Sequence, residues 1–387
     1  MRFIETRPPS DTPLEIDEAA RTRLSSWLNI QITDAISSAL PMQRLWRDNL
    51  RQYEGVPKNP IKTVPIVNMP NIEVTIGAIA CDSLYASAAE LIWSTSPLIT
   101  IRSVVGDEKS AKAAIALQDF ANHVATSELD LRIAYDNATL DDVQLGTGIF
   151  YIPWVEWMKK TNVHVIKNAG PRALCIPIED FIIPVFSYSD LQQLRWCAVR
   201  FWPTMADIED QAQRNPTWDF SHVQSAAAVD WVRQHRENLG HGYQGIQRQG
   251  DIYEIYHIYC YYDIDNDGIA EDLFIVWDRS SQSVINVQYN PYDRRPFEAM
   301  RFQQRAHLFY GMGVMEMLKA YQEEVSELHN QRTLNVIIAN TRLWKARTGA
   351  VPDNLRIWPN RVIQLDDPDA LQPEQMGDVY PSSAQAE

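Results

Sequence analysis

The chain has few of the residues and motifs that would assign it to a common functional class. Its 387 residues include only four cysteines, which lie far apart and have no CxxC spacing: Cys81, Cys175, Cys197 and Cys260. This spacing excludes a disulfide framework and favours a reducing compartment with buried thiols. No run of about 18 apolar residues occurs, so we expect no membrane-spanning helix. The first eleven residues, MRFIETRPPSD, lack the apolar stretch that is typical of a secretory signal peptide.

Positive charge is also scarce. Thirty-five Lys and Arg stand against 50 Asp and Glu, which gives a formal net charge of −15. A protein that holds nucleic acid by neutralising phosphates needs a basic surface. The deficit therefore argues against tight DNA binding, although it is compatible with a protein that lets DNA pass.

Catalytic motifs are missing from the sequence. It contains no GxxxxGK[ST] phosphate-binding loop, no HExxH and no GxSxG, and its 8 histidines are scattered singly. A single histidine is far more often a structural residue than a catalyst. We therefore expect a protein that is not an enzyme.

Apolar periodicity predicts an α+β fold. Hydrophobic residues make up 45% of the chain, as in globular proteins, and its length suits two or three domains. After an irregular arm over residues 1–16, helices are expected over 17–53 (divided at Pro41), 71–93, 107–145 (two helices, the second ending at Gly146), 205–214 and from Gly311 onward.

Strands are predicted where β-branched and aromatic residues cluster. A short strand is expected over 96–103, and three segments at 148–158, 162–167 and 172–178 suggest an antiparallel meander. Further strands are expected over 194–202, 253–262, 273–278 and 283–292.

The most specific motif is an Asp-rich loop between two predicted strands, made of Asp263, Asp265, Asp267 and Glu271. It matches the first half of a calcium loop, in which oxygens at alternate positions surround one cation. The twelfth position holds Phe274 instead of Glu, and the flanking segments are strands rather than helices. The same residues suit a hairpin loop whose side chains accept hydrogen bonds from their own backbone. Both interpretations remain open, and calcium is the one cofactor that the sequence suggests.

The longest helical pattern begins at Gly311 and runs for about 30 residues, or roughly 45 Å. Apolar residues repeat along it with alternating spacings of four and three: Val314, Leu318, Tyr321, Val325 and Leu328. Farther along the helix, the next two positions of this spacing are occupied by the polar residues Arg332 and Asn335. An amphipathic core helix could give this pattern, and so could a helix that leaves its domain and packs beside neighbouring copies.

Three blocks of sequence resemble the portal proteins of tailed bacteriophages, particularly of short-tailed phages. The first is YDNATLDDVQLGTGIFYIPWVEW, followed by IPIEDFIIP and SDLQQLRWCAVRFWPTMADI. The second is YEIYHIYCYYDIDNDGIAEDLFIVW, ending in NPYDRRPF. The third, HLFYGMGVMEMLKAYQEEVSELHNQRTLNVIIANT, precedes PNRVIQLDD and MGDVYPSSAQAE. Together they cover about residues 130–387.

This resemblance implies an α+β subunit with a wing, a long stem helix and a small β clip. Residues 1–310 would form the arm and wing, 311–341 the first stem helix, 342–381 the clip, and 382–387 the start of a second stem helix. The remainder of that helix, the tunnel loop and the crown would lie beyond residue 387, so we expect a truncated chain.

The resemblance also implies function and partners. Usually twelve copies form a ring at one capsid vertex of the virion, assembled in the bacterial host cytoplasm. The ring conducts double-stranded DNA during packaging and ejection without binding it tightly. Its other partners are the large terminase subunit, a head–tail adaptor, and the capsid and scaffolding proteins, with no membrane involved.

A channel lined by carboxylates would repel phosphate and let DNA slide. The clip would present an acidic docking or channel-mouth surface made of Asp366, Asp367, Asp369, Glu374 and Asp378, unless these residues are simply solvated loops. Two other functions stay open. One is a calcium-binding module or calcium-dependent enzyme built around Asp263–Glu271, and the other is a head–tail adaptor, although adaptors are generally smaller helical proteins.

Overall fold

The computed structural model describes residues 13–58, 69–104, 106–129, 131–160, 165–185, 190–226, 252–292, 294–340, 343–346 and 371–374. The chain divides into two compact units. One comprises Met1–Tyr53 with Gly77–Met317, and the other comprises Glu54–Ile76 with Leu318–Glu387.

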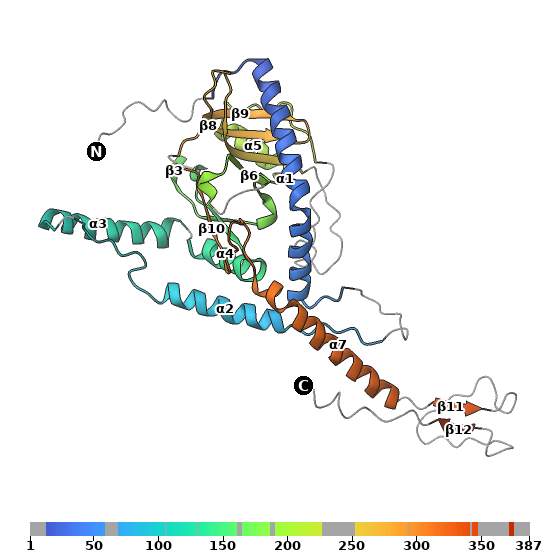
Figure 1. Ribbon diagram of the computed structural model, residues 1–387. Coiled ribbons are helices and arrows are strands. Elements are labelled where there is room, and N and C mark those ends of the chain that lie inside the picture. Colours follow the sequence, from blue (N-terminus) through green and yellow to red (C-terminus); the bar gives the residue numbers. More distant parts are fainter. Residues whose placement is uncertain are drawn as a thin grey trace. The chain divides into compact units, whose positions relative to one another are not determined.

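A five-stranded antiparallel sheet forms the centre of the first unit (Figure 1). Its strands follow the order β5 (Phe181–Ile182), β6 (Trp196–Phe201), β7 (Ile255–Tyr262), β8 (Glu271–Asp278) and β9 (Ser283–Tyr289). The strands predicted over 194–202, 253–262, 273–278 and 283–292 are thereby confirmed. Their long apolar runs reflect burial on both sides, because a strand covered on both faces has no polar face.

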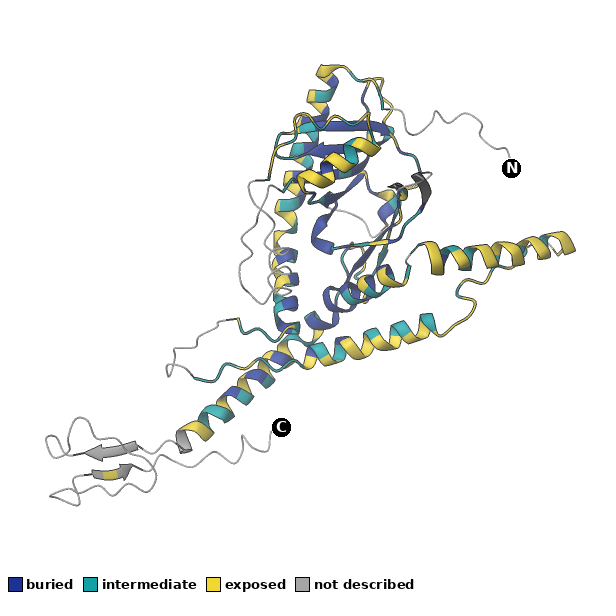
Figure 2. Ribbon diagram, turned by 180° about the vertical axis from the view of Figure 1, so that it is seen from behind, coloured by how far each residue is buried: buried dark blue, intermediate teal, exposed yellow. Residues whose placement is uncertain are grey.

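Helix α1 (Glu18–Tyr53) covers one face of this sheet, as Figure 1 shows. Its residues Leu24, Leu28 and Ile32 pack with alternate strand residues, among them Tyr256 and Trp277. The opposite face packs against α5 (Met205–Arg214) and β10 (Phe297–Met300) through a second cluster that includes Val199, Tyr259, Phe274, Ile208 and Phe297. Figure 2 shows this sheet as the most buried part of the unit.

The expected division of the first helix at Pro41 is wrong, because α1 runs through the proline without a break. A proline inside a helix removes one hydrogen bond and crowds the preceding turn, at a cost of about 3 kcal/mol. Both halves of α1 are buried in cores: Leu24, Leu28 and Ile32 lie in one cluster, and Trp46 and Leu50 lie in another. This packing on either side of Pro41 offsets the local cost.

The predicted three-strand meander over 148–178 is also corrected. The first segment divides at Ile152 and Pro153 into β1 (Gly148–Tyr151) and β2 (Trp154–Lys160). Strand β1 lies between β10 and β4 (Leu174–Ile176), whereas β2 pairs only with β3 (Val165–Pro171). Pro153 has no N–H to continue the ladder, and Ile152 N donates to Pro296 O at 2.8 Å as the chain leaves the sheet.

Four helical segments lie between α1 and this sheet in the described chain: α2 (Ile76–Trp93), α3 (Glu108–His123), the π-helical turn η1 (Val124–Glu128) and α4 (Leu131–Leu145). Helix α2 begins five residues later than predicted.

The strand expected over 96–103 is absent, because side chains of α3 form hydrogen bonds with its backbone groups. Ile99 N donates to Asn122 Oδ1 at 2.9 Å, and Ile101 N donates to Gln118 Oε1 at 3.1 Å. Short 3₁₀ turns occur at η2 (Ile178–Asp180) and η3 (Leu191–Gln193).

Helix α4 ends at Gly146, as predicted, with a φ angle of +90°. The turn packs directly on the residues that precede α7 (Val314–Asn340). Gly311 N donates to Thr147 Oγ1 at 3.0 Å, and a Cβ atom on Gly146 would lie 2.6 Å from Gly313 N. We call this backbone-to-backbone contact the glycine junction. It fixes the first turn of α7 against the end of α4.

Replacing Gly146 with Ala should destabilise the protein by about 2 kcal/mol or more, because the side chain would collide with backbone atoms at a positive φ angle. Urea unfolding would measure the loss. Gly106→Ala is the matched control, since nothing lies within 4 Å of its added Cβ atom. Equal stability of the two variants would contradict this account of the junction.

His257 lies among aromatic rings on the sheet face opposite α1. Its ring centroid is 4.6 Å from that of Phe201 and 5.5 Å from that of Phe274. Its buried Nδ1 has no hydrogen-bond partner among the described residues. Burial lowers the pKa of His257 from its ordinary value to about 4, because this environment disfavours the imidazolium.

A histidine with a lowered pKa in the folded state destabilises the fold on acidification, because the unfolded chain takes up the proton first. We expect the free energy of unfolding to fall by up to about 3 kcal/mol between pH 6.5 and pH 4 on account of His257. His257→Phe should remove that part of the pH dependence. His123→Gln, at an exposed site, should leave the pH dependence unchanged. Unfolding measured at several pH values is the test, and the same pH dependence in the wild type and both variants would refute the assignment.

Candidate functional site

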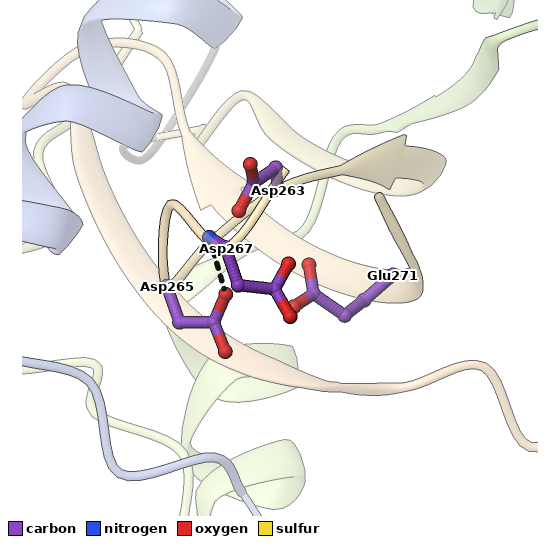
Figure 3. A group of neighbouring side chains, drawn as sticks. All are labelled: Asp263, Asp265, Asp267 and Glu271. Atoms are coloured by element: carbon purple, nitrogen blue, oxygen red, sulfur yellow. Dashed lines mark hydrogen bonds between the residues drawn. The ribbon is translucent and has the colours of Figure 1, made fainter. Parts of the chain in front are cut away.

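The Asp-rich loop connects β7 to β8, and its four acidic side chains converge (Figure 3). One oxygen from each of Asp263, Asp265, Asp267 and Glu271 lies within 4.8 Å of the others. The loop turns at Asn266, with φ of 62°, and at Gly268, with φ of 91°. The sequence spacing therefore did identify side chains that the fold brings together.

Each of the four carboxylates also accepts a hydrogen bond from the loop backbone. Gly268 N donates to Asp263 at 2.9 Å, and Ile264 N donates to Glu271 at 3.0 Å. Asp265 accepts from Asp267 N at 3.2 Å, drawn as the dashed line in Figure 3, and Asp267 accepts from Ile269 N. These bonds are those of a hairpin loop that caps itself. The convergent oxygens are equally the ligand type that Ca²⁺ prefers, so the geometry suits either interpretation.

Helix α7 exposes part of the predicted apolar line to solvent. Val314, at the first turn, is buried, and Leu318 and Val325 are half-buried. Tyr321 is 66% exposed and Leu328 39% exposed. We call Tyr321, Val325 and Leu328 the seam. Large apolar side chains exposed in a row commonly mark an interaction surface.

Beyond the first turn of α7, the buried residues among those described are polar, which sequence reasoning missed. Gln322, Ser326 and Asn330 are 1%, 5% and 2% exposed, and we call these three residues the polar ladder. They contact residues 72–74, which belong to the same unit. The spacing of four residues is a signal that the sequence does contain. Its meaning depends on a segment about 250 residues earlier in the chain.

Beyond α7, β11 (Leu343–Ala346) pairs antiparallel with β12 (Leu371–Glu374). Glu374 is the last residue of β12, and its backbone lies opposite Leu343. The other residues of the predicted clip surface, Asp366, Asp367, Asp369 and Asp378, lie outside the described residues. So do residues 1–12 of the arm and residues 382–387.

A buried ion cluster, not foreseen from the sequence, links the turn η2 with β6, β7 and the end of β8. Arg200 Nε donates to Asp180 at 3.0 Å, and Trp202 Nε1 donates to the same carboxylate at 3.0 Å. Nearby, the Tyr256 hydroxyl donates to Glu254 at 2.5 Å, and Arg279 lies 3.3 Å from Glu254. Buried charges paired in this way orient the strands, and they suggest no reaction.

Among the described helices, none is apolar over a length that would cross a membrane.

We expect the Asp-rich loop to be folded without a cation, because every carboxylate already accepts a backbone hydrogen bond. Asp265→Asn keeps an acceptor oxygen and removes one of four converging charges, so it should change the free energy of unfolding by less than about 0.5 kcal/mol. Thermal unfolding with and without millimolar calcium would measure this. A cation site would instead be established if calcium raised the unfolding temperature of the wild type and Asp265→Asn abolished that increase. The control variant Asp210→Asn should retain it.

Comparison with protein families gives a match over much of the chain. The family described as the phage SU10 portal protein matches residues 156–386, which include the β7–β8 hairpin, α7 and the β11–β12 pair. A search of curated proteins finds no match. The family match confirms the resemblance to portal proteins of short-tailed phages. Since it covers more than half of the chain, this chain belongs to the phage SU10 portal protein family.

Proposed function

We propose that this protein is the subunit of a portal ring, usually of twelve copies, at one vertex of a phage capsid. The ring would conduct double-stranded DNA during packaging and ejection, and would dock the terminase motor and later the head–tail connector proteins. The observation that carries the proposal is the match to a portal family over residues 156–386. The exposed seam on α7 supports it independently, because such a face suits a neighbouring copy.

Portal families are structural, and the chain fits a conduit without catalysis. Its formal net charge of −15 opposes the strong phosphate binding that would stall moving DNA. The protein would be part of the virion, assembled in the host cytoplasm beside the capsid and scaffolding proteins. On this proposal residues 1–310 are arm and wing, 311–341 a stem helix, 342–381 the clip, and 382–387 the start of a second stem helix.

Calcium binding by the Asp-rich loop is a second candidate function. The convergence of four carboxylate groups within 4.8 Å favours it. Cation binding would tighten the β7–β8 hairpin and is compatible with a ring subunit. The calcium measurements on Asp265→Asn decide this point separately from the portal proposal.

Purified protein should form rings with a central hole, visible in negatively stained electron micrographs. Its particle mass should be a multiple of the 44.4 kDa chain, near twelvefold. Mass photometry gives that multiple directly. A solution of monomers at every concentration tested would contradict the proposal.

Neutralising the proposed clip surface should weaken terminase docking and lower the yield of packaged DNA. The variant replaces Asp366, Asp367, Asp369, Glu374 and Asp378 with their amides, which removes five negative charges with little change of shape. A matched control neutralises five exposed acids elsewhere: Glu90, Glu108, Asp119, Glu209 and Asp210. Equal packaging by the two variants and the wild type would remove any role for the clip charges.

A further inference from the structure

A cavity of about 240 Å³ lies inside the first unit, between the middle of α1 and the stretch from Ile178 to Val185. Apolar side chains from both elements form most of its wall, among them Ile36, Met42 and Ile182. Val185 also lines the cavity and is exposed, so the cavity opens to solvent. Neither the portal function nor the Asp-rich loop uses this space.

The volume of the cavity fits a small aromatic molecule. An engineered apolar cavity of about 150 Å³ binds benzene, which has about six non-hydrogen atoms. At the same ratio of atoms to volume, a cavity of about 240 Å³ takes up about ten such atoms. One aromatic ring with one or two small substituents has this size. The rings of Phe181 and Tyr310 are part of the wall and suit an aromatic neighbour.

Polar groups gather at one end of the cavity. Trp46 and Tyr310 line it with their rings edge to face, and the ring centroids are 5.1 Å apart. Trp46 is fully buried, and its Nε1 has no hydrogen-bond partner among the described residues. Glu179 is buried as well and lines the same cavity. It follows Ile178, which belongs to the same core cluster as Trp46. A buried N–H donor and a buried carboxylate therefore border one apolar space.

These two groups select a hydroxyl group on the ligand. The indole N–H of Trp46 is a donor only and needs an acceptor, whereas a carboxylate accepts several hydrogen bonds. A hydroxyl oxygen accepts one hydrogen bond and donates another. A carboxylic acid would place a second negative charge beside Glu179, and a hydrocarbon would leave the N–H of Trp46 without an acceptor. The same pairing already occurs in this fold, since the Tyr256 hydroxyl donates to Glu254 at 2.5 Å.

We propose that this cavity is a binding site for a phenol, whose ring lies between α1 and β5. The hydroxyl accepts a hydrogen bond from Trp46 Nε1 and donates one to the Glu179 carboxylate. A free phenolic compound and the tyrosine side chain of another protein share this chemistry. Binding requires no assembly of subunits, so the phenol site and the portal proposal can fail independently of each other.

Calorimetric titration with p-cresol, the side-chain analogue of tyrosine, tests the site. Toluene is the same molecule without the hydroxyl and serves as the matched ligand. We expect p-cresol to bind at one site per chain and at least about tenfold more tightly than toluene, because only p-cresol forms hydrogen bonds with the two buried groups. Equal affinities for the two ligands, or no binding of p-cresol, would overturn the proposal.

Two substitutions assign the binding to the cavity. Trp46→Phe keeps an aromatic ring and removes the N–H, so it should weaken p-cresol binding about tenfold and leave toluene binding unchanged. Ala39→Leu fills space at a half-buried lining position and should abolish the binding of both ligands, which keeps the test decisive if Trp46→Phe is unstable. Ala116→Leu, at an exposed position of α3, is the control and should bind p-cresol like the wild type. Wild-type affinity in Ala39→Leu would contradict the assignment.

A titration with N-acetyl-tyrosinamide distinguishes the two sources of the phenol. Its amide groups stand for the chain on either side of a tyrosine. Binding as tight as that of p-cresol would assign the site to the tyrosine side chain of a protein partner. Binding at least about tenfold weaker would assign it to free phenolic compounds, because the opening then admits the ring without an attached backbone. Either result supports a phenol site once p-cresol has bound.

Discussion

The hydrogen bonds between the polar ladder and residues 72–74 determine the character of α7. They place amide and hydroxyl groups on the covered side of the helix, so its apolar seam is left on the exposed side. In an isolated domain this arrangement is the reverse of the usual one, in which the apolar stripe is buried. The helix therefore has its hydrophobic surface available for a neighbour.

The first unit provides a rigid base for the start of this helix. Its sheet is buried on both faces by α1, α5 and β10, and paired charges around Arg200 and Glu254 fix three of its strands. The Asp-rich loop lies at one end of the β7–β8 hairpin of this sheet. Its carboxylates either cap the hairpin or hold a cation. In both cases the loop is a local feature of this hairpin.

Several elements could be predicted from the sequence because their cause is local. Strands β6 to β9 have long apolar runs, Thr204 caps α5 through Asp207, and Gly146 ends α4. The errors have long-range causes. Pro41 is tolerated by packing on both sides, and residues 99–101 are bonded by α3 side chains instead of strands. The polar ladder binds Ile72 across 258 positions, a pairing that no local pattern could reveal.

The glycine junction has a mechanical consequence. Where side chains separate two elements, small rotations are absorbed by rotamer changes and by compressible methyl groups. At Gly146, Gly311 and Gly313 the two backbones are in direct contact, with no side chain between them. A rotation of the first turn of α7 would therefore displace backbone atoms at the end of α4, the helix that contacts β1.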